Sequence, residues 1–544
     1  MARLALSRLR DSGVLVVDGD GEQHLAAAEL AAYVAAREAE RPRWVWDDTA
    51  RWYPALLEAG VRVARCQDLR LTRRVLRLAP TVDTTLLDSE DAHHWDSPAP
   101  ATAAEGLFPV DDPAEHLRAD VEDARQQRAV AASSESGRLG LLLAAESAGA
   151  LVAAEMTWAG VPWRADVHDR LLADLLGPRP PRGGRPQVLD DLVQQVRVAL
   201  EAPGLNPDSR PDLLAALRRR GLEIDDVRAS SLRALDHPAI APLLRYKQLA
   251  QLVATNGWAW AETWVSGGRF RPSYQPAGSS TGRWASDGGG ALSFPAAVRG
   301  AAIADEGWRL VVADVAQLEP RVLAAMSGDR ALAGAAHGSD LYQGMVDDGA
   351  VAARADAKLG LLGAMYGATS GESGRMVADL TRRYPVAFGH LEQAARAGER
   401  GEEVRTVLGR GSPPVGDALD ADPDDPSPDV DALARRRRSH GRFTRNFVVQ
   451  GTAAEWASCW IADLRNRLWH LGEHGPLDAR PHLVLFLHDE VVVHTPAHLA
   501  EAVADAAADA AATAAALLFG SGGVDFPLTT AVVESYADAG KPRA

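Results

Sequence analysis

The apolar run VLFLHDEVVVH at residues 484 to 494 constrains this chain most, because His488, Asp489 and Glu490 interrupt it in the middle. Short runs rich in valine and leucine are typical of buried strands. An Asp-Glu pair between two such halves is ordinary turn chemistry. In a poorly solvated site, however, adjacent carboxylates call for a cation. The run therefore predicts a buried ribbon whose polar residues form either a simple hairpin tip or a carboxylate site.

A second apolar strand also ends on a carboxylate. Residues 310 to 322, LVVADVAQLEPRV, form a predicted strand that ends at Asp314 and leads into a helix. If the two strands are neighbours in one sheet, Asp314 and Asp489 face the same point. Carboxylates with open water positions suit Mg²⁺, and a pair of such ions suits in-line phosphoryl displacement. We therefore expect Asp314 and Asp489 to be metal ligands.

A predicted helix at residues 353 to 367, ARADAKLGLLGAMYG, has two cations and an aromatic residue on one face. Arg354, Lys358, Leu362 and Tyr366 follow one another at intervals of four and so share one stripe of the helix. This stripe would suit a triphosphate and a base. Lys358 is one of only three lysines in an arginine-rich chain, which indicates a need for a compact charge. Taken alone, the pattern is equally typical of a solvated helix face.

Charge and composition limit the partners and the compartment. The net charge of -16 argues against a polyanionic partner, because phosphate binding depends on lysine and arginine. Its distribution is uneven, since Arg435 to Arg438 form a basic run while Asp417 to Asp431 is rich in aspartate and proline. Cys66 and Cys459 lie too far apart in the sequence for a disulfide framework. With no signal-peptide core and no run of about 18 apolar residues, we expect a soluble, cytoplasmic, multidomain protein.

Three of these segments resemble motifs of DNA polymerase family A, the class of bacterial DNA polymerase I. The family's first palm motif is Asp-Tyr-Ser-Gln-x-Glu-x-Arg, its fingers helix has Arg-x3-Lys-x7-Tyr-Gly, and its last palm motif is His-Asp-Glu. The matching residues here are Asp314, Gln317, Glu319 and Arg321; Arg354, Lys358, Tyr366 and Gly367; and His488, Asp489 and Glu490. Further matches are TGRWAS at 281 to 286, RFTRNFVVQGTAAEW at 442 to 456, and LNPDSRPDLLAALRRRGL at 205 to 222. The resemblance covers residues 140 to 544 in the family's order.

The resemblance implies a multidomain α/β (α+β) fold, a right-hand polymerase of palm, fingers and thumb. A small α/β exonuclease-like (RNase H-like) domain would precede it. The expected boundaries are 1–135 for the exonuclease-like domain, 136–275 for the thumb, 276–332 for the first part of the palm, 333–445 for the fingers and 446–544 for the rest of the palm.

The resemblance also implies DNA-templated addition of deoxynucleotides to a primer 3′ end, with two Mg²⁺ ions as cofactors. Asp314, Asp489, Glu490 and Lys358 would be catalytic, and Asp314 and Asp489 would hold the metal. The residues implied at the nucleotide are Arg354, Lys358, Leu362, Tyr366, Gln317, Glu319 and Tyr342, and Glu319 would exclude a ribose 2′-hydroxyl. Those implied at the DNA are Arg283, Arg321, Arg442, Asn446, Gln450 and His488. The partners would be primer-template DNA and deoxynucleoside triphosphates, bound by a monomer associated with the nucleoid.

Several positions depart from the family pattern. Val315-Ala316 replaces Tyr-Ser, Pro320 occupies the first turn of a helix, Leu362 replaces an aromatic residue, and Tyr342 stands where a phosphate-contacting histidine is usual. Residues 44 to 77 faintly resemble the proofreading domain, but Arg51 falls where an aspartate is expected and only Asp18 and Asp20 precede it as candidate ligands. We therefore expect no active proofreading. The alternatives are a catalytically silent DNA-binding relative, a polymerase with residual 3′–5′ exonuclease activity, and a family A RNA polymerase, which should lack the carboxylate of Glu319.

Overall fold

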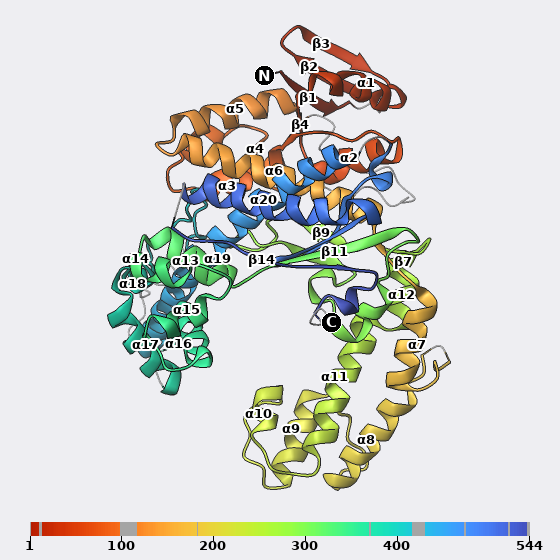
Figure 1. Ribbon diagram of the computed structural model, residues 1–544, viewed down its shortest axis with the longest axis vertical. Coiled ribbons are helices and arrows are strands. Elements are labelled where there is room, and N and C mark those ends of the chain that lie inside the picture. Colours follow the sequence, from red (N-terminus) through yellow and green to blue (C-terminus); the bar gives the residue numbers. More distant parts are fainter. Residues whose placement is uncertain are drawn as a thin grey trace. The chain divides into compact units, whose positions relative to one another are not determined.

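The computed structural model describes residues 2–9, 13–97, 117–181, 183–368, 371–415, 430–472, 475–520 and 523–540 (Figure 1). The chain forms two compact units. Unit 1 contains Met1–Ala159, Ser273–Asp287 and Gly307–Val532, and unit 2 contains Gly160–Pro272, Gly288–Glu306 and Val533–Ala544. The aspartate- and proline-rich stretch from Asp417 to Asp431 lies mostly outside the described residues, which omit 416–429.

The N-terminal part of unit 1 is an α/β domain, in agreement with the predicted class. Its five-stranded sheet has the order β3-β2-β1-β4-β5, in which β1 pairs antiparallel with β2 and parallel with β4. The strands are β1 (Arg3–Arg8), β2 (Val14–Asp18), β3 (Gly21–Leu25), β4 (Arg43–Trp46) and β5 (Cys66–Asp68). The helices are α1 (Leu30–Arg37), α2 (Thr49–Glu58), α3 (Leu69–Leu78), α4 (Ala92–Asp96) and α5 (Ala119–Ala132). Large side chains of β4 and α2, Trp44, Trp46 and Tyr53, fill its core.

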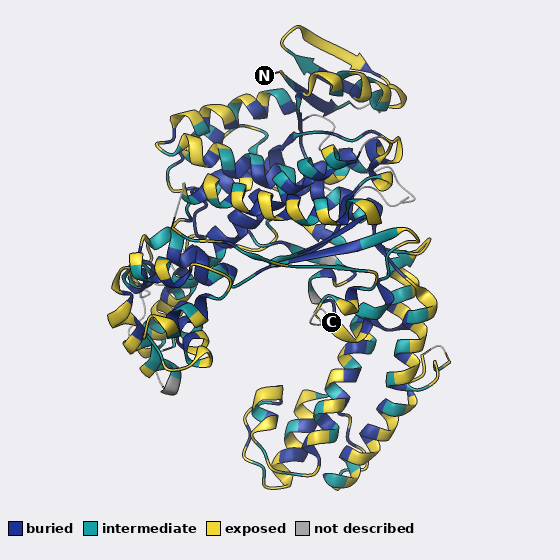
Figure 2. Ribbon diagram, viewed as in Figure 1, coloured by how far each residue is buried: buried dark blue, intermediate teal, exposed yellow. Residues whose placement is uncertain are grey.

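A second sheet of unit 1 contains the two apolar runs that opened the sequence analysis. Its order is β12-β13-β11-β14, with β11 (Trp308–Val315), β12 (His482–Leu487), β13 (Glu490–Pro496) and β14 (Leu528–Val533). The predicted strands therefore exist and are neighbours. Helices α6 (Ser136–Ala159), α19 (Val430–Leu471) and α20 (Ala500–Phe519) contact this sheet. Figure 1 shows α6 and α20 on the same side of it, and Figure 2 shows that the sheet and α6 are largely buried. A separate short hairpin is formed by β9 (Ser273–Gln275) and β10 (Ala285–Gly288).

A helical lobe follows β11 within unit 1 (Figure 1). It consists of α13 (Leu318–Ser327), α14 (Arg330–Ala335), α15 (Leu341–Asp347), α16 (Arg354–Tyr366), α17 (Gly371–Arg383) and α18 (Pro385–Glu399). Pro320 is the third residue of α13, where its missing N–H has no intrahelical partner to lose. α18 packs along α19, and α16 packs against α15 and α17. The lobe is thereby attached to the long helix α19.

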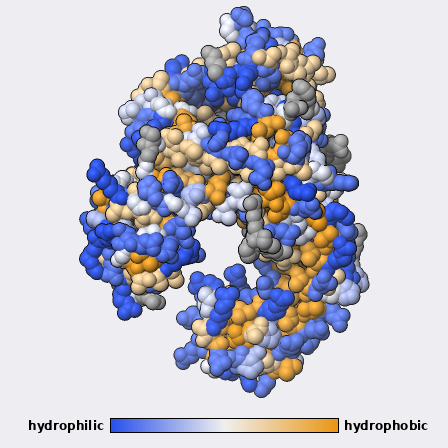
Figure 3. All heavy atoms as spheres, viewed as in Figure 1, coloured by the Kyte–Doolittle hydropathy of each residue, from blue (hydrophilic) through white to orange (hydrophobic). Residues whose placement is uncertain are grey.

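Unit 2 is mostly helical. Its elements are β6 (Val161–Pro162), α7 (Ala165–Leu176), α8 (Gln187–Ala199), α9 (Arg210–Arg219), α10 (Ala229–Arg233), α11 (Ile240–Asn256), α12 (Trp258–Trp264), β7 (Val265–Ser266) and β8 (Arg269–Phe270). One core joins α8, α9 and α11, and a second is an aromatic cluster of Trp163, Trp260, Phe270 and Phe294. Figure 3 shows hydrophobic side chains along the helices of this unit on a face that is otherwise hydrophilic. The predicted thumb, 136–275, begins with α6, but the contacts of α6 place it in unit 1 through Ala159.

Two helices in the described part of the chain are long and apolar enough to cross a membrane, judged by length and composition alone. They are Ser136–Ala159, whose most apolar window is 72% buried inside the molecule, and Ala497–Phe519, whose window is 39% buried. The first is the core helix α6, and burial inside a protein selects the same apolar composition. Such helices are therefore weak evidence for a membrane.

A buried ion pair joins the N-terminal domain to the rest of unit 1. Arg465 of α19 donates two hydrogen bonds to Glu155 of α6, of 2.8 and 2.6 Å. The same guanidinium donates to the carbonyls of Val63 and Ala64, and the Tyr53 hydroxyl donates to Glu155 at 2.6 Å. Three segments far apart in the sequence are thus fixed to one another. Because the charges are shielded from water, each depends on its partner.

Replacing Arg465 with alanine should lower the free energy of unfolding by about 3 kcal/mol, because it removes both charged hydrogen bonds from the buried Glu155 carboxylate and leaves only Arg62, 3.6 Å away, as a cationic partner. Arg467→Ala is the matched control on the same helix. Arg467 is partly exposed and pairs with Asp463 and Asp509 at the surface, so its loss should cost about 0–1 kcal/mol. Denaturant unfolding of both variants measures this, and equal costs would contradict the structural role of the buried pair.

Candidate active site

The tip of the β12–β13 hairpin displays the His-Asp-Glu sequence. Leu487 pairs with Glu490, which leaves His488 and Asp489 as the two residues of the turn. His488 has a left-handed backbone with φ of 60°, a conformation that tight two-residue hairpin turns require. The strands on either side are buried, whereas His488 is exposed and Asp489 and Glu490 are half-buried. The hydrophobic ribbon therefore acts as a rigid support for polar residues at its end.

Strand β11 brings a third carboxylate to the same place. Asp314 lies directly opposite Glu490 in the antiparallel pairing of β11 and β13. The next residue, Val315, donates its N–H to the carbonyl of Asp489 at 3.0 Å. Asp314, Asp489 and Glu490 therefore gather at one end of two buried strands.

The burial and crowding of these carboxylates shift their pKa values. Burial, together with the charges of Asp489 and Glu490, raises the pKa of Asp314 to about 7. Burial also raises the pKa of Asp489. Both shifts mean that the carboxylates are costly to ionise in this place, and a bound cation would offset that cost. In the described residues no group of three or more His, Cys, Asp or Glu side chains is close enough to enclose a metal alone. The donor set still fits Mg²⁺, which binds through one or two carboxylates and keeps water or phosphate oxygens as its other ligands.

Glu319, in the first turn of α13, connects three neighbouring elements. It forms an ion pair with Arg283, from the loop before β10, and accepts a hydrogen bond from the Tyr366 hydroxyl of α16 at 3.3 Å. Gln450 of α19 in turn donates to the Tyr366 oxygen at 3.5 Å. Burial raises the pKa of Glu319 above its usual value. The four side chains form one polar chain beside the carboxylates of the sheet.

A buried arginine supports the loop that carries Arg283. Gly282 has φ of +81°, and a Cβ added there would lie 2.6 Å from Nε of Arg410. Arg410 donates to Glu146 of α6 at 2.6 Å. Arg410 belongs to the segment between α18 and α19, and Glu455 of α19 holds this segment by accepting from Thr406 and from the N–H of Leu408. Sequence reasoning missed this support. A signal was present in Glu146, which with Glu155 is one of two carboxylates in the apolar stretch of α6.

The predicted stripe on α16 exists. Arg354, Lys358 and Tyr366 are exposed and Leu362 is half-buried, while the opposite side of the helix, with Leu361 and Met365, is fully buried. Arg354 donates from Nε to Asp340 at 2.6 Å, and its Cζ lies 5.5 Å from the ring centre of Tyr342. The stripe is thus a surface and not part of the core.

The α19 residues with predicted DNA roles are accessible. Arg442 is exposed and packs beside Gly367, and Asn446 is half-buried with an Oδ1 that has no hydrogen-bond partner in the described part of the chain. Arg435 to Arg438, in the first turns of the same helix, are exposed.

Arg321 requires a correction. It was predicted to contact DNA, but its guanidinium is fully buried and donates to the carbonyls of Ala316, Ala336, Gly338 and Asp525. All of its nitrogens serve the backbone around α13, so it has a structural role in this structure.

The N-terminal domain lacks an open carboxylate cluster in its described residues. Arg51 forms a 2.9 Å ion pair with Asp47, and Arg8 donates to the carbonyl of Arg51. Asp68 is buried and caps α3, and burial with the nearby Asp48 raises its pKa to about 7. The candidate ligands Asp18 and Asp20 instead belong to the turn between β2 and β3, where Asp18 pairs with Arg37.

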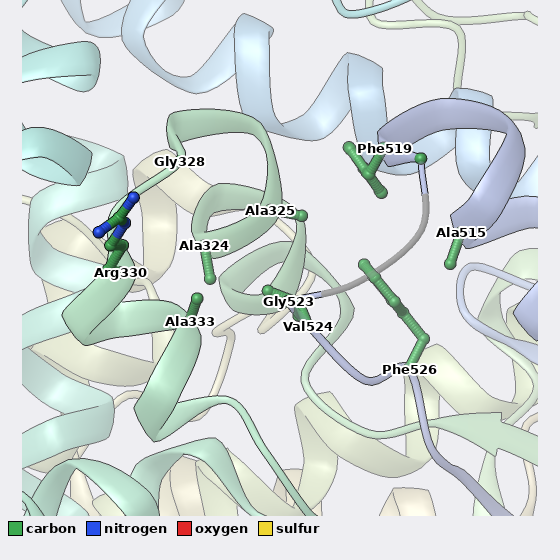
Figure 4. Close-up of a pocket in the computed structure, with 11 residues that line it drawn as sticks. Ala324, Ala325, Gly328, Arg330, Ala333, Ala515, Phe519, Gly523, Val524 and Phe526 are labelled. Carbon is green, nitrogen blue, oxygen red and sulfur yellow. The ribbon is translucent and has the colours of Figure 1, made fainter.

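A cavity of about 230 Å³ lies elsewhere in unit 1 (Figure 4). It is lined by α13, α14, the end of α20 and the segment around Phe526, where Phe519 and Phe526 stack in parallel. Arg330 is the one charged side chain in its lining. The cavity contains none of the carboxylates described above.

Comparison with known proteins identifies relatives for most of the chain. The sequence model described as DNA polymerase family A matches residues 215–533. DNA polymerase I of Chloroflexus aurantiacus is 28% identical over 319 residues, which is 54% of this chain and 32% of that protein. The thermostable DNA polymerase I of Thermus thermophilus is 29% identical over 295 residues, covering 49% of this chain and 33% of the relative. The chain thus spans about a third of the length of these curated relatives.

A solved structure resembles the whole chain. It is described as the POL domain of Pol1 from M. smegmatis in complex with DNA primer-template and dNTP. The TM-score is 0.70 over 99% of this chain and 96% of that chain, at 19% sequence identity. The likeness establishes a common fold.

Proposed function

This chain belongs to DNA polymerase family A, and we propose that it is a DNA-templated DNA polymerase that adds deoxynucleotides to a primer 3′ end. The observation that supports this most strongly is the pairing of Asp314 opposite Glu490, beside Asp489, at the end of two buried strands. Rigid carboxylates at such a place suit phosphoryl transfer, in which catalysis depends on positioning and on charge stabilisation. The printed names of the relatives point the same way.

Asp314 and Asp489 would hold two Mg²⁺ ions, with Glu490 in support. When bound, the metal would make the primer 3′-hydroxyl a better nucleophile and neutralise the triphosphate as pyrophosphate leaves. The strands of this sheet keep the carboxylates in place before any ligand binds, so little reorganisation is needed during the reaction.

The exposed stripe of α16 would receive the incoming nucleotide. Arg354 and Lys358 offer positive charge to the triphosphate, and Lys358 would stabilise the leaving group as its charge grows. Tyr366 would stack near the new base pair, and Leu362 lies between them on the same stripe. Gln317 and Glu319 lie at the start of α13. Glu319 would close the space beside the 2′ carbon and so disfavour ribonucleotides.

Primer-template DNA would contact Arg283, Asn446, Gln450, Arg442 and His488. The exposed arginines Arg435 to Arg438 would meet phosphates. We further propose palm, fingers and thumb domains near the expected boundaries, with the thumb starting after α6, in a monomer that acts in the cytoplasm at the nucleoid.

The N-terminal domain would have no proofreading activity. A metal-dependent exonuclease needs several open carboxylates, whereas Asp47 is paired with Arg51 and Asp68 serves as a helix cap. The main rival is a catalytically silent DNA-binding relative. The carboxylates at the strand ends and the exposed Lys358 count against it.

Asp314→Asn or Asp489→Asn should abolish nucleotide addition and leave primer-template affinity nearly unchanged, because a lost metal ligand removes transition-state stabilisation and not contacts along the duplex. Primer extension and DNA binding, measured with Mg²⁺, separate the two effects. Asp525→Asn is the control, since Asp525 is exposed in the same unit and its side chain has two long contacts, with His337 at 3.4 Å and with the N–H of Gly338 at 3.3 Å. Near-normal extension by either variant would contradict the proposal that Asp314 and Asp489 are metal ligands.

Glu319→Ala should raise ribonucleotide incorporation much more than it changes deoxynucleotide incorporation, tenfold for about each 1.4 kcal/mol of penalty removed. The alternative is that Glu319 only orients Arg283, its ion-pair partner. Arg283→Ala is therefore the matched variant, for which both substrates should fall together. If Glu319→Ala also lowers ribonucleotide and deoxynucleotide incorporation at an unchanged ratio, Glu319 does not discriminate between the two sugars, and the other assignments of the site are unaffected.

The purified protein should leave a mismatched primer 3′ end intact when it is incubated with Mg²⁺ and no nucleotides. The reason is that Arg51 occupies the position expected of a metal ligand, and a guanidinium cannot replace a carboxylate there. Gel analysis of the labelled primer measures this. Digestion that persists in Asp314→Asn but stops when Asp18 and Asp20 are changed would overturn the prediction.

A further inference from the structure

Arg354 is held in a specific orientation although its side chain is about half exposed. An exposed arginine loses rotamer freedom when it is fixed, so a single surface pair holds it weakly. Here two groups act at once. Asp340 accepts from Nε at 2.6 Å, and the ring of Tyr342 lies under the guanidinium, 5.5 Å from Cζ. Side-on and face-on contacts together define the plane of the guanidinium.

Asp340 is itself firmly placed. Its Oδ1 caps α15, accepting from the N–H groups of Tyr342 and Gln343 at 3.0 and 3.2 Å, and it also accepts from Nε2 of Gln317 at 2.9 Å. Gln317 completes the connection by accepting the N–H of Leu341 at 2.8 Å. Oδ2 remains for Arg354. Asp340 therefore links Gln317, three residues beyond Asp314, to the exposed stripe of α16.

The contact with Asp340 uses only the inner nitrogen of Arg354. Nη1 and Nη2 have no hydrogen-bond partner among the described residues, and the side chain is 51% exposed. These two nitrogens form the planar fork that matches phosphate oxygens. Tyr342 is 5% exposed, so its ring is a fixed surface and is itself poorly placed to meet a ligand.

We propose that Asp340 and Tyr342 are positioning residues, which hold Arg354 so that its terminal nitrogens face the triphosphate of the incoming nucleotide. The inference rests on the proposed polymerase function and deepens it, because neither residue would touch the substrate. It also gives Tyr342 a different role from the direct nucleotide contact expected from the sequence. The ring would act through Arg354.

If only the charge of Asp340 mattered, its removal would change nucleotide binding in the opposite direction from our proposal, which allows a decisive test. Asp340 brings a negative charge close to a binding site for a polyanion, so its removal should strengthen nucleotide binding if charge is what matters. If orientation matters, its removal should weaken binding, because Arg354 must then be ordered at the expense of binding energy. The sign of the change separates the two explanations.

The experiment measures equilibrium binding of the next complementary deoxynucleoside triphosphate, with Mg²⁺ and a primer-template that ends in a dideoxynucleotide. Asp340→Ala and Tyr342→Ala should each raise the dissociation constant about tenfold, and Tyr342→Phe should raise it less because the ring remains. Asp348→Ala is the matched control, since Asp348 pairs with Arg383 and Tyr384 in the same helical lobe and away from the α16 stripe. It should leave binding unchanged.

A double-mutant cycle tests whether the effect passes through Arg354. In an Arg354→Ala background, Asp340→Ala should have no further effect on binding. A tighter complex for Asp340→Ala, or an equal loss with and without Arg354, would overturn the proposal. Nucleotide binding by the unmodified chain, without extension of a second primer that ends in a 3′-hydroxyl, would refute the polymerase function while this binding test still applied. Absence of nucleotide binding by that chain would overturn both.

Discussion

The pairing of β11 with β13 is the constraint on which the candidate site depends. Successive residues of a strand face opposite sides, so a shift of one residue would move every side chain of β11 to the other face. The valines of both strands are buried on both faces of the sheet, so a slip would force closely packed side chains into positions of the wrong shape, which fixes the register. The same register sets Asp314 opposite Glu490. Apolar packing thus maintains an arrangement of like charges that would otherwise be unfavourable, and the raised pKa of Asp314 reflects that cost.

Several arginines of unit 1 lie inside the molecule and not on its surface. Arg465 binds Glu155, Arg410 binds Glu146, and Arg321 binds four carbonyls. Each is almost inaccessible to water, and each joins segments distant in sequence. A planar group with five donors can satisfy more acceptors at once, and in a more fixed geometry, than the three donors of lysine. The arginine-rich composition is therefore partly a means of fixing buried connections, and only part of it is available for nucleic acid.

Local patterns in the sequence were sufficient for the strands, for the α16 stripe and for the hairpin that carries Asp489, because each depends on periodicity or turn chemistry. Long-range contacts could not be predicted in this way. The family motif gives no sign that the guanidinium of Arg321 turns inward to the backbone, or that Arg283 pairs with Glu319. The boundary implied by the resemblance likewise placed α6 in the thumb, since the sequence of a helix does not show which neighbours it packs against. Which groups a long side chain contacts is determined only in the folded structure.

Helix α19 is a rigid connection between the N-terminal domain and the candidate site. It is continuous from Val430 to Leu471, and it carries Gln450 near the site and Arg465 at its attachment to the N-terminal domain. At 1.5 Å per residue these two positions are about 22 Å apart along one stiff rod. A tilt of about 5° around the attachment would therefore move the Gln450 end by about 2 Å, more than a hydrogen bond tolerates. The N-terminal domain can thus determine the alignment of side chains at a distant site, as the clamp of a lever determines where its free end points.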